Sequence, residues 1–277
     1  MADGQVWLDG TLVSGAAATV SVFDHGLTVG DGVFETLKAV EGVPFAVRRH
    51  IDRLRRSAFG LGLRVPYDDD EIRVAIDKVL ASHTDLPLAR VRVTVTGGAS
   101  PLGSERGEAG PMVVVAVGPL AEAAPSTAVC TVPWPRNERG AMAGIKTTSY
   151  AENVVALAYA RDRGCTEAIF ATTTGLLCEG TGSNVFVVID GRLVTPPLAS
   201  GCLAGVTRDL VLQVTDAVEE DIPMEAFHQA DEVFLTSTGR DVQPVHRVDD
   251  RGMYVPGDVT EAAAQAFAEL AATTSDP

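Results

Sequence analysis

An Ala- and Pro-rich stretch without helical or strand periodicity divides the chain into two parts. It runs from Gly118 to Thr127, as GPLAEAAPST, and follows a run of strand-like residues. The chain has 277 residues, and a domain typically takes about 100–200. These features predict an N-terminal domain over residues 1–118, an interdomain linker over 119–126 and a C-terminal domain over 127–277.

The first part combines short strands with two helices. From Gln5 to Gly42, strand-like runs alternate with turns, and Glu41-Gly42 is typical of a hairpin tip. The segments His50–Leu63 and Glu71–His83 place apolar residues at helical spacing. Two β-rich runs, RVRVTVTGG and PMVVVAVG, follow. The pattern predicts an α+β domain.

The second part also mixes helices and strands. We expect a strand at AVCTV, a loop, and a helix from about Ala151 to Arg163. The runs EAIFAT, NVFVVID, RLVT and DEVFLTS predict further strands, with a helix starting near Thr207 and a closing helix at TEAAAQAFAELAAT. The fold class is therefore α+β in both parts.

Charge and composition exclude several classes of function. A net charge of −15 repels phosphate backbones and anionic lipid surfaces, so we expect no nucleic-acid partner. The longest apolar stretch, Met112 to Val117, is far shorter than the roughly 20 residues that cross a bilayer. The first ten residues have neither a basic nor an apolar signal region. These observations predict a cytoplasmic protein without a membrane partner.

Cysteine and histidine spacing does not favour a metal site. The four cysteines form no C-x-x-C pair, and the five histidines show no H-x-x-x-H or H-x-x-E-H spacing. We therefore expect no catalytic metal, and we interpret the cysteines as small buried hydrophobic residues.

Only three of the 22 basic residues are lysines. Lys38 in an alternating strand and Lys78 on an amphipathic helix are typical of solvated surface lysines. Lys146 lies in a loop of small, mostly uncharged residues that leads into a helix. Such a setting suits a Schiff-base lysine, although the residues alone slightly favour a structural role.

Several segments could hold an anion. Val206 and Thr207 stand at a predicted helix start, where backbone amides are available, but a simple Thr N-cap is by itself the more common arrangement. The run Thr236–Gly239 places three hydroxyls in a turn after a strand. Arg53 could add a guanidinium, or simply face water. Glu179 lies between a turn and an apolar strand and needs a partner, either a protonated ring nitrogen or an arginine.

Taken together, these segments resemble the fold-type IV pyridoxal-phosphate enzymes. That family includes branched-chain aminotransferases, D-amino-acid aminotransferases and 4-amino-4-deoxychorismate lyases. The similar stretches are GDGVFETLKAVEG, HIDRL, GIKTTSYAENVVAL, EGTGSNVFVV, LVTPPLASGCLAGVTR and DEVFLTSTGRDVQPV, in this order along nearly the whole chain. The resemblance implies an N-terminal α/β sandwich, a C-terminal β-barrel-like α+β domain that binds pyridoxal 5'-phosphate, and an active site between the two.

The resemblance also implies a role for individual residues. Lys146 corresponds to the lysine that forms a Schiff base with the cofactor and serves as catalytic acid and base, and Glu179 to the partner of the pyridine nitrogen. Leu203 corresponds to a residue that packs on the cofactor ring. The implied phosphate contacts are Arg53, Val206, Thr207 and Thr238. A homodimer is implied as well.

The resemblance leaves the reaction open between lyase and aminotransferase. Tyr150 stands four places after Lys146, whereas branched-chain enzymes usually have a tyrosine five places on. The stretch GGASPLGSERG lacks the histidine of the R-x-H carboxylate clamp found in D-amino-acid enzymes. These departures favour a lyase of folate biosynthesis that converts 4-amino-4-deoxychorismate to 4-aminobenzoate and pyruvate. An amino-acid aminotransferase of the D-amino-acid or branched-chain type is the alternative.

Two further residues are candidate contacts for the small-molecule amine substrate. Arg92 corresponds to a position where several family members have an arginine near the substrate carboxylate, although an outward-facing arginine on an alternating strand is equally open. Thr36 could face the cofactor, but alternation alone does not say which face of its strand is inside.

Overall fold

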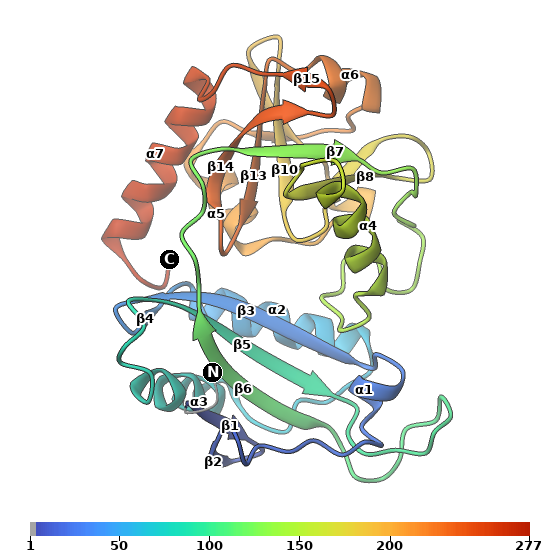
Figure 1. The fold of residues 1–277 in the computed structure, drawn as a ribbon, viewed down its shortest axis with the longest axis vertical. Helices are drawn as coiled ribbons and strands as arrows, with labels where there is room; N and C mark the ends of the chain where they lie inside the picture. The colour runs from blue at the N-terminus through green and yellow to red at the C-terminus, as the bar shows by residue number, and fades with distance from the viewer. Residues whose placement is uncertain (1–3) are drawn as a thin grey trace. The chain divides into compact units, whose positions relative to one another are not determined.

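The computed structural model describes residues 4–277, which form two compact units (Figure 1). The first unit holds the chain up to Ala121 together with Ile145–Tyr150 and Asp276, and the second holds the rest. Both units mix helices with strands, so the predicted α+β class is confirmed. Among the described residues, no helix is long and apolar enough to cross a membrane.

The first unit is a six-stranded antiparallel sheet with two helices packed on it. The strand order is β2-β1-β6-β5-β3-β4. The strands are β1 (Gln5–Leu8), β2 (Thr11–Ser14), β3 (Gly32–Val40), β4 (Val43–Pro44), β5 (Leu88–Thr96) and β6 (Met112–Pro119). The helices are α1 (His25–Thr28), α2 (Val47–Gly60) and α3 (Asp69–Ala81).

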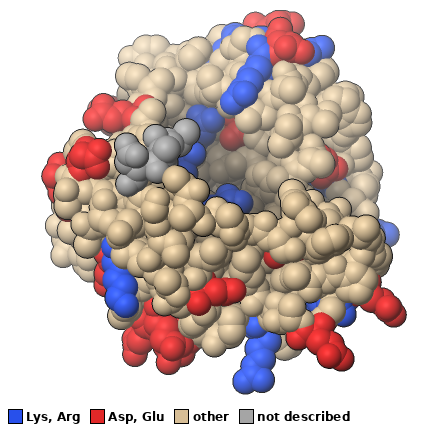
Figure 2. Space-filling model, turned by 60° about the horizontal axis from the view of Figure 1, so that its bottom comes forward, with Lys and Arg blue, Asp and Glu red and all other residues tan. Residues whose placement is uncertain are grey.

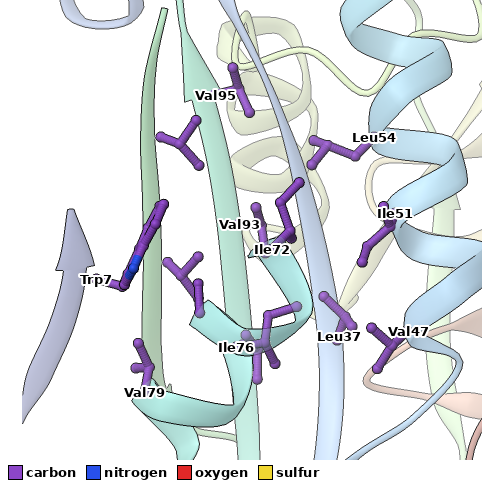
Figure 3. Packing of buried hydrophobic residues seen from close by; sticks show 14 of the residues in the cluster. Trp7, Leu37, Val47, Ile51, Leu54, Ile72, Ile76, Val79, Val93 and Val95 are labelled. Carbon is purple, nitrogen blue, oxygen red and sulfur yellow. The ribbon is translucent and has the colours of Figure 1, made fainter. Parts of the chain in front are cut away.

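The core of this unit lies between the sheet and helices α2 and α3 (Figure 3). Leu37 of β3 is 1% exposed and packs with Ile51 and Leu54 of α2, while Ile72 and Ile76 of α3 belong to the same cluster. The two helical patterns expected from the sequence are thus confirmed. Each buries the stripe of apolar residues that its periodicity defines.

Local signals fix the ends of these elements. Asp68 accepts the N–H of Glu71, and the Glu71 carboxylate accepts the N–H of Asp68, so a capping box starts α3. Glu41 and Gly42 both have positive φ, 48° and 77°, as a tight turn between twisted strands requires. The predicted hairpin tip is confirmed, because Val40 pairs with Val43 on either side of it.

The second unit is built on a nine-stranded mixed sheet. Its order is β12-β11-β10-β13-β14-β7-β8-β9, and β15 pairs with β14. The strands are β7 (Thr127–Thr131), β8 (Glu167–Ala171), β9 (Leu177–Gly180), β10 (Asn184–Ile189), β11 (Arg192–Thr195), β12 (Val218–Glu219), β13 (Glu232–Ser237), β14 (Asp241–Val248) and β15 (Arg251–Gly252). The helices are α4 (Ala151–Arg161), the 3-10 turn η1 (Leu198–Ser200), α5 (Val206–Val214), α6 (Met224–Gln229) and α7 (Asp258–Thr273).

The segment Ile145–Tyr150 corrects one expectation about the domains. The sequence places it in the C-terminal domain, but it clusters with the first unit. The N–H of Phe34 donates to the carbonyl of Lys146 at 2.9 Å, and the N–H of Thr148 donates to the carbonyl of Gly32 at 2.8 Å. These bonds satisfy backbone groups of β3, so Lys146 is positioned by the first unit.

The environment of the cysteines agrees with the prediction made from their spacing. All four cysteines are free and buried, which confirms their interpretation as small hydrophobic residues. Figure 2 shows acidic and basic side chains interspersed among uncharged ones on the face that it draws.

Candidate functional site

Lys146 carries its amine to an aromatic ring on the first sheet. Its Nζ lies 4.4 Å from the ring centroid of Phe34 in β3, and Phe34 is 4% exposed. The guanidinium carbon of Arg92 lies 3.3 Å from the same centroid, and the ring of Tyr150 meets Phe34 edge-on at 5.3 Å. The structure therefore gathers one amine, one guanidinium and two aromatic rings into what we call the Lys146 cluster.

Thr36 and Arg92 belong to the same face of the sheet as Phe34. They oppose each other across strands β3 and β5, and side chains that are directly opposite share a face. Val33 and Leu37 point instead into the helix-packed core. The sequence could not tell which face of β3 was inside, and the structure assigns the core to the Val33 face.

Glycines before β3 let the lysine segment approach closely. Gly30 has a φ of 70°, and a Cβ there would lie 2.6 Å from Ser149 Oγ. A Cβ on Gly32 would lie 2.8 Å from the carbonyl oxygen of Val95. Ser149 Oγ donates to the carbonyl of Gly30 at 2.9 Å. The GDG sequence thus provides the space in which the backbone beside Lys146 is held.

A buried ion network lies on the core side of the same strand. Glu35, 1% exposed, accepts hydrogen bonds from Arg53 Nε at 2.7 Å and Nη2 at 2.8 Å, and its Oε2 lies 2.7 Å from His50 Nδ1. Burial alone would raise the pKa of Glu35, but the charge and hydrogen bonds of Arg53 and His50 hold that pKa well below its usual range. Burial also lowers the pKa of His50.

This network contains Arg53, a predicted phosphate contact, and Glu35, which was not predicted. Arg53 is buried in α2, with its fork engaged by Glu35. Its alternative interpretation as a water-facing arginine is therefore wrong. Glu35 was not singled out, because alternation alone does not say which face of its strand is buried, and only a buried acid needs a buried cation.

In the second unit, Glu179 is held at both carboxylate oxygens. Its Oε2 accepts the N–H of Leu203 at 2.9 Å, and its Oε1 lies 3.5 Å from Arg136 Nε. Both side chains of the ion pair are 14% exposed. Of the two partners considered for Glu179, an arginine is thus present in the structure. Arg136 itself was not identified from the sequence.

Helix α5 begins without a side-chain cap. Its N-cap is Gly205 in an extended conformation, and the first two helical residues, Val206 and Thr207, are buried. The interpretation of Thr207 as a simple N-cap is wrong, because it is already the second residue of the helix. Asn184 Nδ2 donates to the carbonyl of Leu203 at 2.8 Å, and a Cβ on Gly205 would overlap Asn184 Oδ1.

The end of strand β13 lies beside this helix start through its pairing with β10. Thr236 opposes Asn184 and is 1% exposed, and its Oγ1 has no hydrogen-bond partner among residues 4–277. A buried hydroxyl without a partner is costly unless a ligand satisfies it. Together with the uncapped amides of α5, it suits an anionic group. Thr238 follows in the turn after β13.

The loop over residues 97–107, which lacks the histidine of the carboxylate clamp, is bonded to other parts of the first unit. Its one arginine, Arg106, donates to Asp31 through Nε at 2.7 Å and Nη2 at 2.6 Å, and to the carbonyls of Leu61 and Gly62. This pairing lowers the pKa of Asp31 and raises that of Arg106, with the hydrogen bond between them as the main cause. Arg106 thus holds the loop rather than presenting a free guanidinium.

Comparison with known proteins places this geometry in a family. The model of the family described as amino-transferase class IV matches residues 32–248. The chain is 31% identical to a branched-chain-amino-acid aminotransferase of Pseudomonas aeruginosa, with 97% of this chain and 93% of that protein covered. It is 29% identical to a D-alanine aminotransferase of Staphylococcus epidermidis, with 88% and 89% covered.

Solved structures agree with the sequence relatives. The crystal structure of a branched-chain aminotransferase from Thermoproteus uzoniensis superposes with a TM-score of 0.89 at 30% identity, covering 96% of this chain and 94% of the other. The branched-chain amino acid aminotransferase from Escherichia coli gives 0.89 at 28% identity, covering 97% and 94%. A further branched-chain enzyme, complexed with N-(5'-phosphopyridoxyl)-L-glutamate, gives 0.89 at 27% identity, covering 99% and 95%. The chain therefore belongs to the class IV aminotransferase family.

Proposed function

We propose that the protein is a pyridoxal-phosphate-dependent amino-acid aminotransferase, which moves the amino group of an amino acid to an oxo acid. The observation that carries this proposal is the Lys146 cluster, in which a rare lysine presents its amine on a face that also holds Arg92. An amine can take and return the proton of a substrate carbon, and a guanidinium can bind a carboxylate.

The described residues fit the cofactor. Its phosphate suits the start of α5 at Val206 and Thr207, which has no side-chain cap, and the hydroxyl of Thr236, which has no hydrogen-bond partner within residues 4–277. The turn at Thr238 follows the same strand. A carboxylate such as Glu179 suits a protonated ring nitrogen. When bound, pyridoxal phosphate supplies an electron sink for the charge that develops at the substrate carbon.

Arg53 and Leu203 are the two other cofactor contacts that we propose. Arg53 is proposed as a phosphate contact because the resemblance implies it, in addition to the hydrogen bonds that its Nε and Nη2 donate to Glu35. Leu203 would pack against the cofactor ring, next to the carboxylate that its own N–H holds. In this scheme Lys146 binds the cofactor and moves the proton, and Glu179 controls the charge of the ring nitrogen.

The comparisons support the aminotransferase over the lyase favoured by the sequence. The relatives described above carry aminotransferase names, of the branched-chain and D-alanine types. The lyase inference depended on the spacing of Tyr150 from Lys146 and on a missing histidine. A shift of one residue in the position of the tyrosine and the absence of one histidine are both features of the edge of the site. The reaction depends on substrate contacts that these two features do not define.

A parallel assay tests the proposal. The cofactor-loaded protein is incubated with 2-oxoglutarate and one amino donor at a time, either L-leucine, L-valine, L-isoleucine or D-alanine. Formation of glutamate is followed in each reaction. A second arm contains 4-amino-4-deoxychorismate without an oxo acid, and release of 4-aminobenzoate is followed. We expect glutamate in at least one amino-acid reaction. Release of 4-aminobenzoate without any glutamate formation would overturn the aminotransferase proposal.

A further inference from the structure

Arg136 is fixed by contacts from several elements of the second unit. Its N–H donates to the carbonyl of Ala171 at 2.7 Å, which places its backbone beside strand β8. Its Nη1 donates to Glu152 Oε2 at 2.5 Å and to Asn153 Oδ1 at 3.0 Å, both in α4. Its guanidinium carbon lies 4.1 Å from the ring centroid of Phe170. The side chain therefore has little freedom to move.

A second nitrogen of this guanidinium, Nε, faces Glu179. Arg136 Nε is buried and has no hydrogen-bond partner within residues 4–277, and it lies 3.5 Å from Glu179 Oε1. Phe170 and Glu179 oppose each other across β8 and β9, so the ring that supports the guanidinium lies on the same face as the carboxylate. Glu179 Oε1 is therefore the carboxylate oxygen that the structure brings to this buried nitrogen.

Glu152 alone does not account for the position of Arg136. The Glu152 side chain is 52% exposed, and an exposed ion pair contributes little to stability. A buried Nε without a partner carries a desolvation cost that an arginine serving only Glu152 could avoid by moving outward. The buried position is explained if the guanidinium also acts on the carboxylate of Glu179.

We propose that Arg136 is a positioning residue that orients the Glu179 carboxylate and keeps it ionised, with Leu203 N–H holding the second oxygen. This inference rests on the proposed function, in which Glu179 pairs with the ring nitrogen of the cofactor. A cation beside a carboxylate favours its charged form, and two fixed contacts define the direction of its lone pairs. Arg136 itself need not touch the cofactor.

A double-mutant cycle tests whether Arg136 acts through Glu179. Four proteins are compared: wild type, Arg136→Met, Glu179→Gln and the double variant. We expect Arg136→Met to lower kcat by about 10- to 100-fold, with a smaller change in KM. In the Glu179→Gln background the same substitution should change kcat less than about twofold, because the group on which it acts is already gone.

Two readouts other than turnover separate positioning from a general loss of structure. The visible absorption spectrum of the bound cofactor should change in the same direction in Arg136→Met and Glu179→Gln. Urea unfolding of the cofactor-free proteins should show the two substitutions to be non-additive. Arg136→Lys, which keeps the charge but not the planar fork, should recover part of the lost kcat.

Arg163 provides a matched control. It also stacks on an aromatic ring of the second unit, 3.4 Å from the centroid of Tyr159, but it is exposed. Arg163→Met should leave kcat and the spectrum unchanged.

The possible outcomes distinguish the inference from the proposed function. An Arg136→Met protein with wild-type kcat and spectrum, or one whose defect is equally large in the Glu179→Gln background, would overturn the role of Arg136. Full transaminase activity in Lys146→Ala would instead overturn the proposed function.

Discussion

At the scale of single residues, Glu35 is a buried charge that contributes to the stability of the first unit. It is buried and accepts hydrogen bonds from Arg53 and His50. Glu35→Gln leaves the Arg53 charge without its buried partner, so we expect it to lower the free energy of unfolding at pH 7 by about 3–5 kcal/mol. Urea titration measures this loss. Glu41→Gln, at an exposed hairpin tip, should cost little.

The pH dependence of this contribution has a definite sign. The pKa of folded Glu35 lies below its ordinary value of 4.5, so the network stabilises the protein above that value. The stabilisation is lost as the pH falls from there towards the folded pKa. The gap in free energy of unfolding between wild type and Glu35→Gln should therefore stay constant from pH 7 down to about pH 5 and narrow between about pH 5 and pH 3. A gap that stays constant down to about pH 3 would contradict the role of the ionised carboxylate.

Arg92 is the residue with which we expect a substrate carboxylate to bind. Burial lowers its pKa to about 10, so it stays charged at neutral pH. Arg92→Gln should raise the KM of the oxo-acid substrate about tenfold while kcat changes less than about threefold, because a binding contact is lost. Arg90, exposed two positions earlier on the same strand, is the control. Equal effects of Arg90→Gln and Arg92→Gln would contradict a specific contact.

At this scale the sequence indicated candidate site residues but not all of the residues that contact them. Lys146 and Glu179 stood out because a lysine in an apolar loop and an acid before an apolar strand both need an explanation. Glu35 and Arg136 did not stand out, because their partners Arg53 and Glu179 lie at distant positions in the sequence. Such pairings depend on register, which the sequence does not state.

At the scale of elements, the start of α5 depends on a glycine. A Cβ on Gly205 would overlap Asn184 Oδ1, and Asn184 is itself held by Leu203. We expect Gly205→Ala to displace this contact and to raise the dissociation constant of pyridoxal phosphate at least about tenfold, as measured by fluorescence titration. Gly182→Ala, where nothing lies within 4 Å of the added Cβ, should bind normally. Normal binding by both variants would contradict a tight site at this helix start.

Elements with strong periodicity could be predicted, and those defined by distant contacts could not. Helices α2 and α3 follow from their apolar stripes, and the β3–β4 hairpin follows from its turn residues. The assignment of Ile145–Tyr150 to the first unit had no local signal. It depends on hydrogen bonds to β3, about a hundred residues or more earlier in the chain.

At the scale of the whole molecule, exposed apolar side chains support the expected homodimer. Val22, Phe23 and Leu27 are 70%, 51% and 67% exposed, and they lie close together in sequence. Clustered apolar exposure of this kind is typical of interaction surfaces. We expect light scattering after size-exclusion chromatography to give twice the chain mass, and Leu27→Asp to shift it towards the monomer. Tyr254→Asp, at an isolated exposed aromatic residue, should remain a dimer. A monomeric wild type would contradict the prediction.

The family could be predicted from the sequence, but the reaction could not. Motifs in a fixed order define a fold and a cofactor, because both depend on backbone turns and buried groups. The choice between transamination and elimination depends on how a substrate sits over the Lys146 amine, and a few peripheral residues do not determine that. The comparisons with aminotransferases therefore changed the preferred reaction without changing the family.

The most direct test of the central claim compares wild type with Lys146→Ala in one assay. Both proteins are supplied with pyridoxal phosphate, a branched-chain L-amino acid or D-alanine, and 2-oxoglutarate, and the product oxo acid and glutamate are quantified. We predict equimolar products from wild type and a loss of at least about a thousandfold in Lys146→Ala, because the amine that moves the proton is gone. Turnover of the variant at the wild-type rate would contradict the assignment of Lys146.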